Sequence, residues 1–442
     1  MYQNHRQKLL NLFREQSGHL IYLKGGSVAG RYHTDFEYPF RQESNFLYLT
    51  GIDEPDMAAF FECGSGEYTL VIPRRSSQFA VWMGYILTPE EYRERYGPDH
   101  IIYNDEVHDW LKKRAPQQIH ILPDSGDEIA KAGYQTESGE LQDALAYCRV
   151  IKTDGEMDCL KKAASAANQA HLEVMKAVGP GVREYEMKAL FDYHTHRHGM
   201  VHAPYSGIFA SGPGSAILHY TGYRRTVEAN ELFLVDAGAE YAGYAADVTR
   251  TMPAGASFTP LQADLYDIVL DAQNTALNLI RPGNKMEDLH LAAARCIASG
   301  LRDCGLLRGS VDDLMETNIF ALFFPHGLGH FLGLDTHDVG GYPKGTEKID
   351  RPGLRFLRAR RTFESGMVLT IEPGLYFIPA LLEPAFEDGK TSSFLNREKL
   401  AGLLDFGGIR IEDNVIVRDD GMENLTTAPK TRHEIEHVKQ GD

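Results

Sequence analysis

Residues 230–252 read "NELFLVDAGAEYAGYAADVTRTM", with a strand pattern on each side of a glycine-containing turn. The apolar run at residues 232–235 predicts a buried strand that ends at Asp236. A hairpin turning at residues 241–242 would place Asp236 opposite Asp247, with their Cβ atoms about 5 Å apart. Facing carboxylates repel, so such a pair requires a shared proton, a buried cation or a metal ion. The alternative is an exposed, solvated aspartate.

Two further strand patterns each carry one glutamate. In "GMVLTIEPGLYF" (366–377), Glu372 interrupts an apolar run, and the proline after it keeps the chain extended. In "FGGIRIEDNVIV" (406–417), alternation places Arg410 and Glu412 on one face. A bare carboxylate is costly to bury, so a glutamate in such an apolar strand is usually paired. A surface pair between Arg410 and Glu412 is an equally good interpretation.

Three histidines lie in the glycine-rich stretch "FFPHGLGHFLGLDTHDVGG" (323–341), namely His326, His330 and His337. The first two are four residues apart, as in a helical zinc motif. That motif needs a glutamate between them, and the two glycines found there oppose a helix. Glycine lets the backbone approach other segments closely, so we expect loops and strand edges to present the three imidazoles. Three histidines this close together favour a functional site over unrelated surface residues.

A rival histidine cluster, "HTHRHGMVH" (194–202), ends a helical pattern. Its spacing of two residues points successive side chains apart, and such residues are ordinary at a helix C-terminus. We interpret these four histidines as surface residues: His194, His196, His198 and His202.

The composition limits the possible partners. The 45 Lys and Arg residues against 62 Asp and Glu residues give a net charge of −17, which disfavours nucleic acid and anionic membranes. No window reaches the roughly 18 apolar residues of a membrane span. The start lacks the apolar run of a signal peptide, and the five cysteines form no CxxC motif. We expect reduced thiols and a cytoplasmic location.

The 442 residues predict two domains of a mixed α/β, α+β-type protein, at 1–152 and 153–442. Short apolar runs in the first domain suggest strands: "HLIYLKGG", "NFLYLTG", "MAAFFE" and "YTLVIP". In the second, a helix should begin at Asp154, capped by Thr153 or Asp154. The other patterns predict helices at 183–199, 259–280 and 285–306, and strands at 231–236, 243–251, 367–377 and 408–418.

The second domain thus offers four carboxylates together with several histidines. A carboxylate-rich site with one imidazole suits Mn²⁺, and Co²⁺ or Zn²⁺ would also be accepted. Four carboxylates carry four negative charges, which two divalent cations would neutralise.

The segments that contain these residues resemble the metal-binding segments of the pita-bread metallopeptidases, which include methionine aminopeptidase, aminopeptidase P and prolidase. "YPFRQESNFLYLTGIDEP" (38–55) resembles the creatinase-like N-terminal domain of the last two. The resemblance runs from about residue 36 to about residue 435. It implies a creatinase-like N-terminal domain followed by a pita-bread catalytic domain.

The resemblance also implies a ligand set for two metal ions. Asp247 and Glu412 would bridge both ions, Asp236 would complete one site, and His330 and Glu372 the other. In this family the paired metals activate water for hydrolysis. Glu372 would also carry protons. The remaining residues of the implied catalytic and substrate-binding set are His219, His326, His337, Tyr205 and Arg410.

Three stretches resemble prolidases in particular. "LRFLRARRTFESGMVLTIEP" (354–373) implies that Arg358 binds the C-terminal carboxylate of the substrate. Residues 381–408 resemble a segment of the animal-type enzymes. "FAVWMGYI" (79–86) implies a homodimer in which Trp82 closes over the active site of the partner subunit.

The expected activity is therefore hydrolysis of dipeptides with proline in second position. The alternative within the family is an aminopeptidase that removes the residue before proline from longer peptides. A non-catalytic binding protein and a metal-free amidinohydrolase are disfavoured, because all five ligand positions carry the expected residue types.

Overall fold

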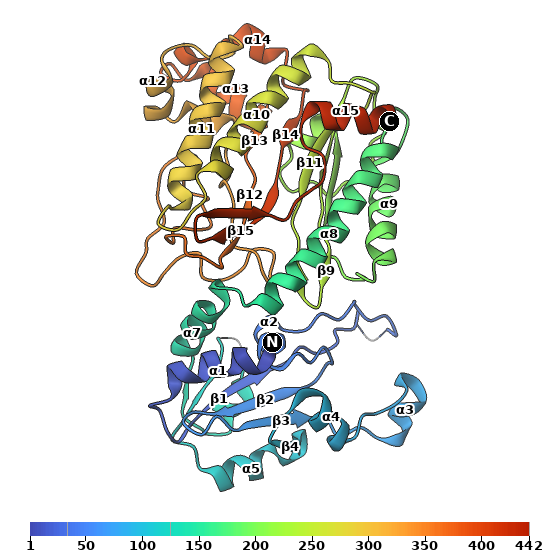
Figure 1. Ribbon diagram of the computed structural model, residues 1–442, viewed down its shortest axis with the longest axis vertical. Helices are drawn as coiled ribbons and strands as arrows, with labels where there is room; N and C mark the ends of the chain where they lie inside the picture. Colours follow the sequence, from blue (N-terminus) through green and yellow to red (C-terminus); the bar gives the residue numbers. More distant parts are fainter. Residues whose placement is uncertain (33, 124, 442) are drawn as a thin grey trace. The chain divides into compact units, whose positions relative to one another are not determined.

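The computed structural model describes residues 1–32, 34–123 and 125–441. It divides into two compact units, Met1–Arg149 and Val150–Asp442. The expected boundary after residue 152 lies close to this division. Each unit combines helices with sheets (Figure 1), which confirms the mixed α/β class. Within the described ranges, no helix has both the length and the apolar composition needed to cross a bilayer.

The N-terminal unit is built on a six-stranded mixed sheet with the order β4-β3-β2-β1-β5-β6. Its strands are β1 (His19–Lys24), β2 (Ala58–Glu62), β3 (Tyr68–Ile72), β4 (His100–Tyr103), β5 (Gln118–His120) and β6 (Thr136–Glu137). Its helices are α1 (Tyr2–Phe13), α2 (Ser44–Thr50), α3 (Ser77–Met83), α4 (Pro89–Tyr96), α5 (Val107–Arg114), α6 (Asp127–Lys131) and α7 (Gly139–Val150).

The prediction of a strand at "NFLYLTG" was wrong, because these residues form helix α2. The Glu43 carboxylate caps it by accepting the Phe46 N–H at 2.6 Å. Gly51 ends it in the left-handed conformation, with φ of 73°. Most of its side chains are buried, so the segment lacks the polar face that identifies an amphipathic helix.

The C-terminal unit contains four small sheets, with the orders β11-β8-β7, β12-β15-β16, β13-β14 and β10-β9. The strands are β7 (Ile208–Ser211), β8 (Leu232–Asp236), β9 (Glu240–Tyr241), β10 (Tyr244–Ala245), β11 (Thr249–Pro253), β12 (Val368–Ile371), β13 (Gly374–Tyr376), β14 (Gly408–Arg410), β15 (Asp413–Arg418) and β16 (Gly421–Asn424). The helices are α8 (Asp154–Ala177), α9 (Glu184–Arg197), α10 (Pro260–Asn278), α11 (Met286–Asp303), α12 (Val311–Glu316), α13 (Pro379–Glu387), α14 (Arg397–Ala401) and α15 (Arg432–Gln440).

Helices cover the strands of this unit on both sides. Helix α10 packs on β12, β13 and β14, while α8 and α9 pack against β7, β9 and β10 (Figure 1). Helix α8 begins after Thr153, whose N–H donates to the Glu156 carboxylate at 2.8 Å. Between the helices, the strands form the floor on which the acidic residues lie.

Three of the predicted strands are each divided in two, and the break falls at an acidic residue. Asp247 lies between β10 and β11, Glu372 between β12 and β13, and Glu412 between β14 and β15. Because β12 and β13 belong to different sheets, as do β14 and β15, the chain changes sheet at each glutamate.

The predicted centre of the first hairpin was wrong by one residue. The turn lies at Ala242–Gly243, both with positive φ, and Asp236 pairs with Thr249. Two positive φ values define the type I′ turn, which fits the twist of paired strands. Continuing the register places Asp247 two positions from Thr249, so it is the diagonal neighbour of Asp236 on the same face.

Candidate active site

The C-terminal unit encloses a cavity of about 720 Å³. Its lining includes most of the residues singled out from the sequence: Tyr205, His219, Asp236, Asp247, His326, His330, His337, Arg358, Glu372, Arg410 and Glu412. Trp82 is not among them; it lies on α3 of the N-terminal unit and is 80% exposed. Ile208, Leu218 and Phe356 add apolar wall.

Three buried side chains converge at the floor of the cavity. One ligand atom each from Asp247, His330 and Glu412 lies within 4.8 Å of the other two. His330 Nε2 is 3.4 Å from Asp247 Oδ2 and 3.6 Å from Glu372 Oε1. Its Nδ1 lies 2.9 Å from the Phe331 carbonyl, which accepts a proton there, so Nε2 is the ring nitrogen that faces the carboxylates.

The glycine-rich segment delivers His330 without a helix. Residues 323–341 run as irregular chain beside β12, where Thr370 N–H donates to the His330 carbonyl at 2.9 Å and Glu372 N–H to the Leu328 carbonyl at 2.7 Å. A Cβ at Gly329 would lie 2.0 Å from the Thr370 carbonyl oxygen, so the close approach requires glycine. The expectation that the four-residue spacing is not a helical zinc motif is confirmed.

Neighbouring hydroxyls and a guanidinium hold the carboxylates. The Tyr205 hydroxyl lies 2.9 Å from Asp236 Oδ1 and 2.5 Å from Asp247 Oδ1. Thr249 Oγ1 donates to Glu412 Oε2 at 2.7 Å. Arg410 Nη2 donates to Asp236 Oδ2 at 2.6 Å, so the interpretation of Arg410 as a surface partner of Glu412 was wrong. The side chains of Arg410 and Glu412 are both buried.

Crowding of the carboxylates is reflected in their proton affinities. Burial, reinforced by the charge of Asp247, raises the pKa of Glu412 well above its ordinary value. Burial raises the pKa of Glu372 to about 7 and also raises that of Asp236, in spite of Arg410. Burial acts the same way on Asp247, but the hydrogen bond and charge of His330, together with the Tyr205 hydroxyl and the charge of His337, outweigh it and lower the pKa of Asp247. Arg410 offsets only one of the four carboxylate charges, and the donor set of four carboxylates and one imidazole fits divalent cations.

A hydrogen-bond chain that sequence reasoning missed runs behind the cluster. Arg410 Nη1 donates to the Tyr376 hydroxyl at 2.7 Å, and that hydroxyl lies 2.9 Å from His326 Nε2. His326 Nδ1 lies 2.8 Å from the Gly327 carbonyl, so both ring nitrogens are engaged. The pairing of β13 with β14 aligns Gly374 with Arg410. Tyr376 lies two residues further along β13, so knowledge of this pairing could have identified it as a neighbour of Arg410.

The remaining predicted residues lie toward the opening. The His337 ring is 4.4 Å from that of His330 in an edge-on arrangement. Burial, followed by the charges of His330 and Arg358, lowers the pKa of His337 to about 4. His219 and Arg358 are exposed and line the cavity. The rival histidines do not line it; three of them lie at the end of α9.

Comparisons with known proteins agree with this geometry. Residues 158–419 match the model of metallopeptidase family M24, and residues 2–122 match that of the aminopeptidase P N-terminal domain. The chain is 41% identical to the Xaa-Pro dipeptidase of Homo sapiens, over 99% of this chain and 92% of that one. It is 36% identical to a probable Xaa-Pro aminopeptidase of Coccidioides posadasii, over 96% and 94%.

Among solved structures, aminopeptidase P of Escherichia coli superposes with a TM-score of 0.87 at 30% identity, covering 100% of this chain and 98% of that one. The enzyme of Pseudomonas aeruginosa gives 0.85 at the same identity, with 100% and 97% covered. These matches confirm the expected fold of both domains. With its acidic cavity and a match over more than half its length, the chain belongs to metallopeptidase family M24.

Proposed function

We propose that this metallopeptidase is an Xaa-Pro dipeptidase that works with two divalent cations, Mn²⁺ in the first place. The observation that carries the proposal is the 41% identity, over nearly the whole chain, to mammalian proteins named Xaa-Pro dipeptidase. The position of Arg358 at the cavity opening supports it, because a guanidinium there can bind the carboxylate of a short substrate.

The cations would be held by Asp236, Asp247, His330, Glu372 and Glu412. When bound, they activate water and polarise the scissile carbonyl. The charge balance supports two ions. The four carboxylates carry four negative charges and Arg410 offsets one, so two divalent cations leave a single positive charge to stabilise negative charge on the substrate.

The side chains of the protein would manage protons and orientation. Glu372 faces the cavity beside His330, so its carboxylate can take a proton from the attacking water and pass it to the leaving nitrogen. That nitrogen belongs to the proline ring and needs a proton to depart as a secondary amine. His337 lines the cavity beside His330, and together with His219 it can donate to the oxyanion.

The enzyme would select substrates of dipeptide length by binding both ends of the substrate. The acidic cluster would attract the free α-amine, and Arg358 would pair with the proline carboxylate. Tyr205 and Arg410 would hold the carboxylates in place, and His326 would support Arg410 through the Tyr376 hydroxyl.

Xaa-Pro aminopeptidase activity is the second candidate. The fungal relatives carry that name, and the solved structures that superpose on the chain are aminopeptidase P. The two activities differ in the length of the substrate, so Arg358 distinguishes them.

The test is Arg358→Ala assayed on Ala-Pro, Ala-Pro amide and Ala-Pro-Ala with Mn²⁺. Loss of a charge-assisted contact of about 1.5–3 kcal/mol should raise KM for Ala-Pro roughly 10- to 150-fold. The amide, which has no carboxylate, should lose far less. Arg355→Ala is the matched control, because Arg355 is exposed in the same segment and does not line the cavity. Equal losses on Ala-Pro and its amide would show that Arg358 does not bind the carboxylate, and would favour Xaa-Pro aminopeptidase activity.

The proposal includes a cytoplasmic homodimer. Helix α3 exposes Val81, Trp82 and Met83, an apolar surface that a second copy could cover. Light scattering after size exclusion should give twice the chain mass, and Trp82→Ala should weaken the dimer or lower activity. A monomer with full activity would exclude this part of the proposal.

A further inference from the structure

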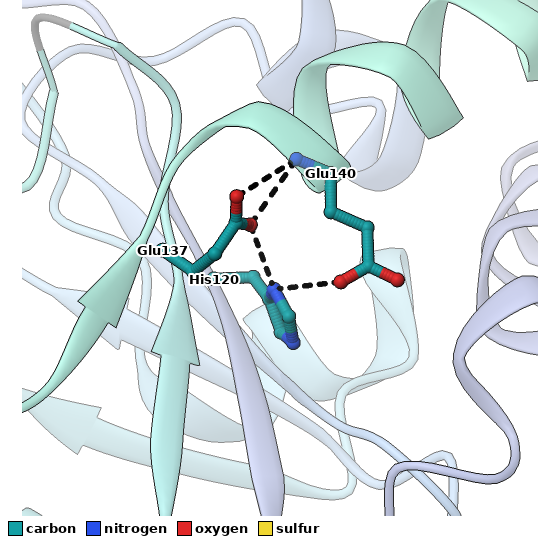
Figure 2. Close-up of side chains that lie close together, drawn as sticks. All are labelled: His120, Glu137 and Glu140. Carbon is teal, nitrogen blue, oxygen red and sulfur yellow. Dashed lines mark hydrogen bonds and ion pairs between the residues drawn. The ribbon is translucent and has the colours of Figure 1, made fainter.

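A second group of metal-ligand side chains lies in the N-terminal unit, where sequence reasoning found none. His120 ends β5, Glu137 ends β6 and Glu140 stands in the first turn of α7 (Figure 2). One ligand atom of each lies within 4.8 Å of the other two. His120 Nδ1 is 3.3 Å from Glu137 Oε2 and 3.9 Å from Glu140 Oε2. The two carboxylates therefore face a single ring nitrogen.

Gln16 determines which nitrogen of His120 carries the proton. Its amide Nε2 donates to Glu140 Oε1 at 2.7 Å, and an ionised carboxylate can only accept. The amide oxygen is thereby turned toward His120 Nε2, at 2.7 Å, and accepts a proton from it. His19 Nδ1 lies 3.3 Å from the same nitrogen. In the neutral imidazole, Nδ1 is consequently a lone pair directed at two carboxylates.

A positive centre between the three groups would complete this arrangement. Among the described residues, neither Glu137 nor Glu140 forms an ion pair with a lysine or arginine. A proton on Nδ1 would make a single hydrogen bond of 3.3 Å, longer than the roughly 2.7–2.9 Å of a charge-assisted one. Glu140 Oε2, 3.9 Å away, would lie beyond hydrogen-bond distance of it. A cation placed about 2.0–2.2 Å from each ligand would bind all three.

The ligands are also held from behind, as metal ligands usually are. Glu137 Oε1 accepts the backbone N–H of Gly139 at 2.7 Å and that of Glu140 at 3.1 Å. Gln16 contacts both His120 and Glu140. The His120 side chain is 1% exposed, while those of Glu137 and Glu140 are 34% and 50% exposed, so an ion can enter from solvent and keep water ligands.

We propose that His120, Glu137 and Glu140 bind one further divalent cation, Zn²⁺ in the first place, outside the active site. An imidazole with two carboxylates is a donor set that Zn²⁺ accepts. The ion would join the ends of β5 and β6 to the start of α7. It takes no part in the proposed hydrolysis, so the two proposals fail independently.

The experiment counts Zn²⁺ by elemental mass spectrometry after dialysis of the full chain against micromolar Zn²⁺. To remove the active-site ions, the chain carries Asp247→Asn and Glu412→Gln, and circular dichroism verifies its fold. One Zn²⁺ per chain should remain, and adding Glu140→Gln should abolish it. Gln16→Leu should weaken binding about 10- to 100-fold, since it removes the support of two ligands.

Glu15→Gln is the matched control, because it removes one exposed carboxylate next to Gln16 and should retain the ion. If the double variant does not fold, the otherwise unmodified chain serves, and Glu140→Gln should lower its total Zn²⁺ count by one. An equal count with and without Glu140→Gln overturns the proposal. So does ¹⁵N NMR that shows both His120 nitrogens protonated at saturating Zn²⁺.

Discussion

At the scale of single residues, the proposed mechanism gives Glu372 two tasks, to bind a cation and to move a proton. Glu372→Gln should keep the fold, because the amide has the same shape, but should lower kcat by about 10²- to 10⁴-fold or more because it cannot carry the proton. Glu364→Gln is the control, since Glu364 is exposed in the same segment. Near-normal turnover at full metal content would disprove the assigned role.

Thr249 acts on the same centre indirectly, as a positioning residue. Its hydroxyl donates to Glu412 Oε2 at 2.7 Å and accepts from Arg410 Nε at 3.2 Å. Thr249→Val should therefore lower metal affinity about 10- to 100-fold, measured by calorimetric titration with Mn²⁺. Thr251→Val removes another buried hydroxyl of β11, one that donates to a backbone carbonyl instead. If both variants lose the same affinity, the effect is general destabilisation and Thr249 does not position Glu412.

At the scale of elements, the backbone contact between the His330 segment and β12 leaves no room for a side chain. Gly329→Ala places a Cβ 2.0 Å from the Thr370 carbonyl oxygen, so backbone must move. We expect a loss of stability of about 1–3 kcal/mol or more, measured by thermal unfolding, with reduced metal content. Gly389→Ala, where no atom lies within 4 Å of the new Cβ, should be neutral. A stable, fully loaded Gly329→Ala protein would show that the contact is adaptable.

The same elements show which features of the fold can be predicted from sequence patterns and which cannot. Alternation and apolar runs located the strands at 231–236 and 367–377, because burial of one face imposes that period. They did not reveal that β12 and β13 join different sheets, since a sheet change at Glu372 leaves the alternation intact. The hairpin register was missed because Ala242 takes a positive φ that its side chain does not suggest. The cavity residues were assigned by family resemblance, whereas Tyr376 and Thr249 are defined by strand register.

At the scale of the whole molecule, one buried ion pair joins the start of the catalytic unit to the loop of His337. Lys152 Nζ lies 2.9 Å from Asp338 Oδ2, with both side chains about 1% exposed. Lys152→Met removes the ammonium group from this buried pair, which should cost about 3–5 kcal/mol. The double variant Lys152→Met/Asp338→Asn should recover part of that loss in denaturant unfolding. No recovery would show that the two charges are not coupled.

The proposed metal ions would affect the stability of the catalytic unit as a whole. The four carboxylates come from β8, from the turn before β11 and from the two sheet changes, so the ions would join separate sheets through buried like charges. Chelation should lower the midpoint of thermal unfolding, because ions that bind only the folded state stabilise it by about 2.7 kcal/mol each at a hundredfold excess over Kd. Mn²⁺ should restore both the midpoint and activity. Anomalous scattering from Mn²⁺-grown crystals should show two ions held by Asp236, Asp247, His330, Glu372 and Glu412. A single fully occupied site in this cavity, or ions at His194–His202 instead, would contradict the ligand assignment.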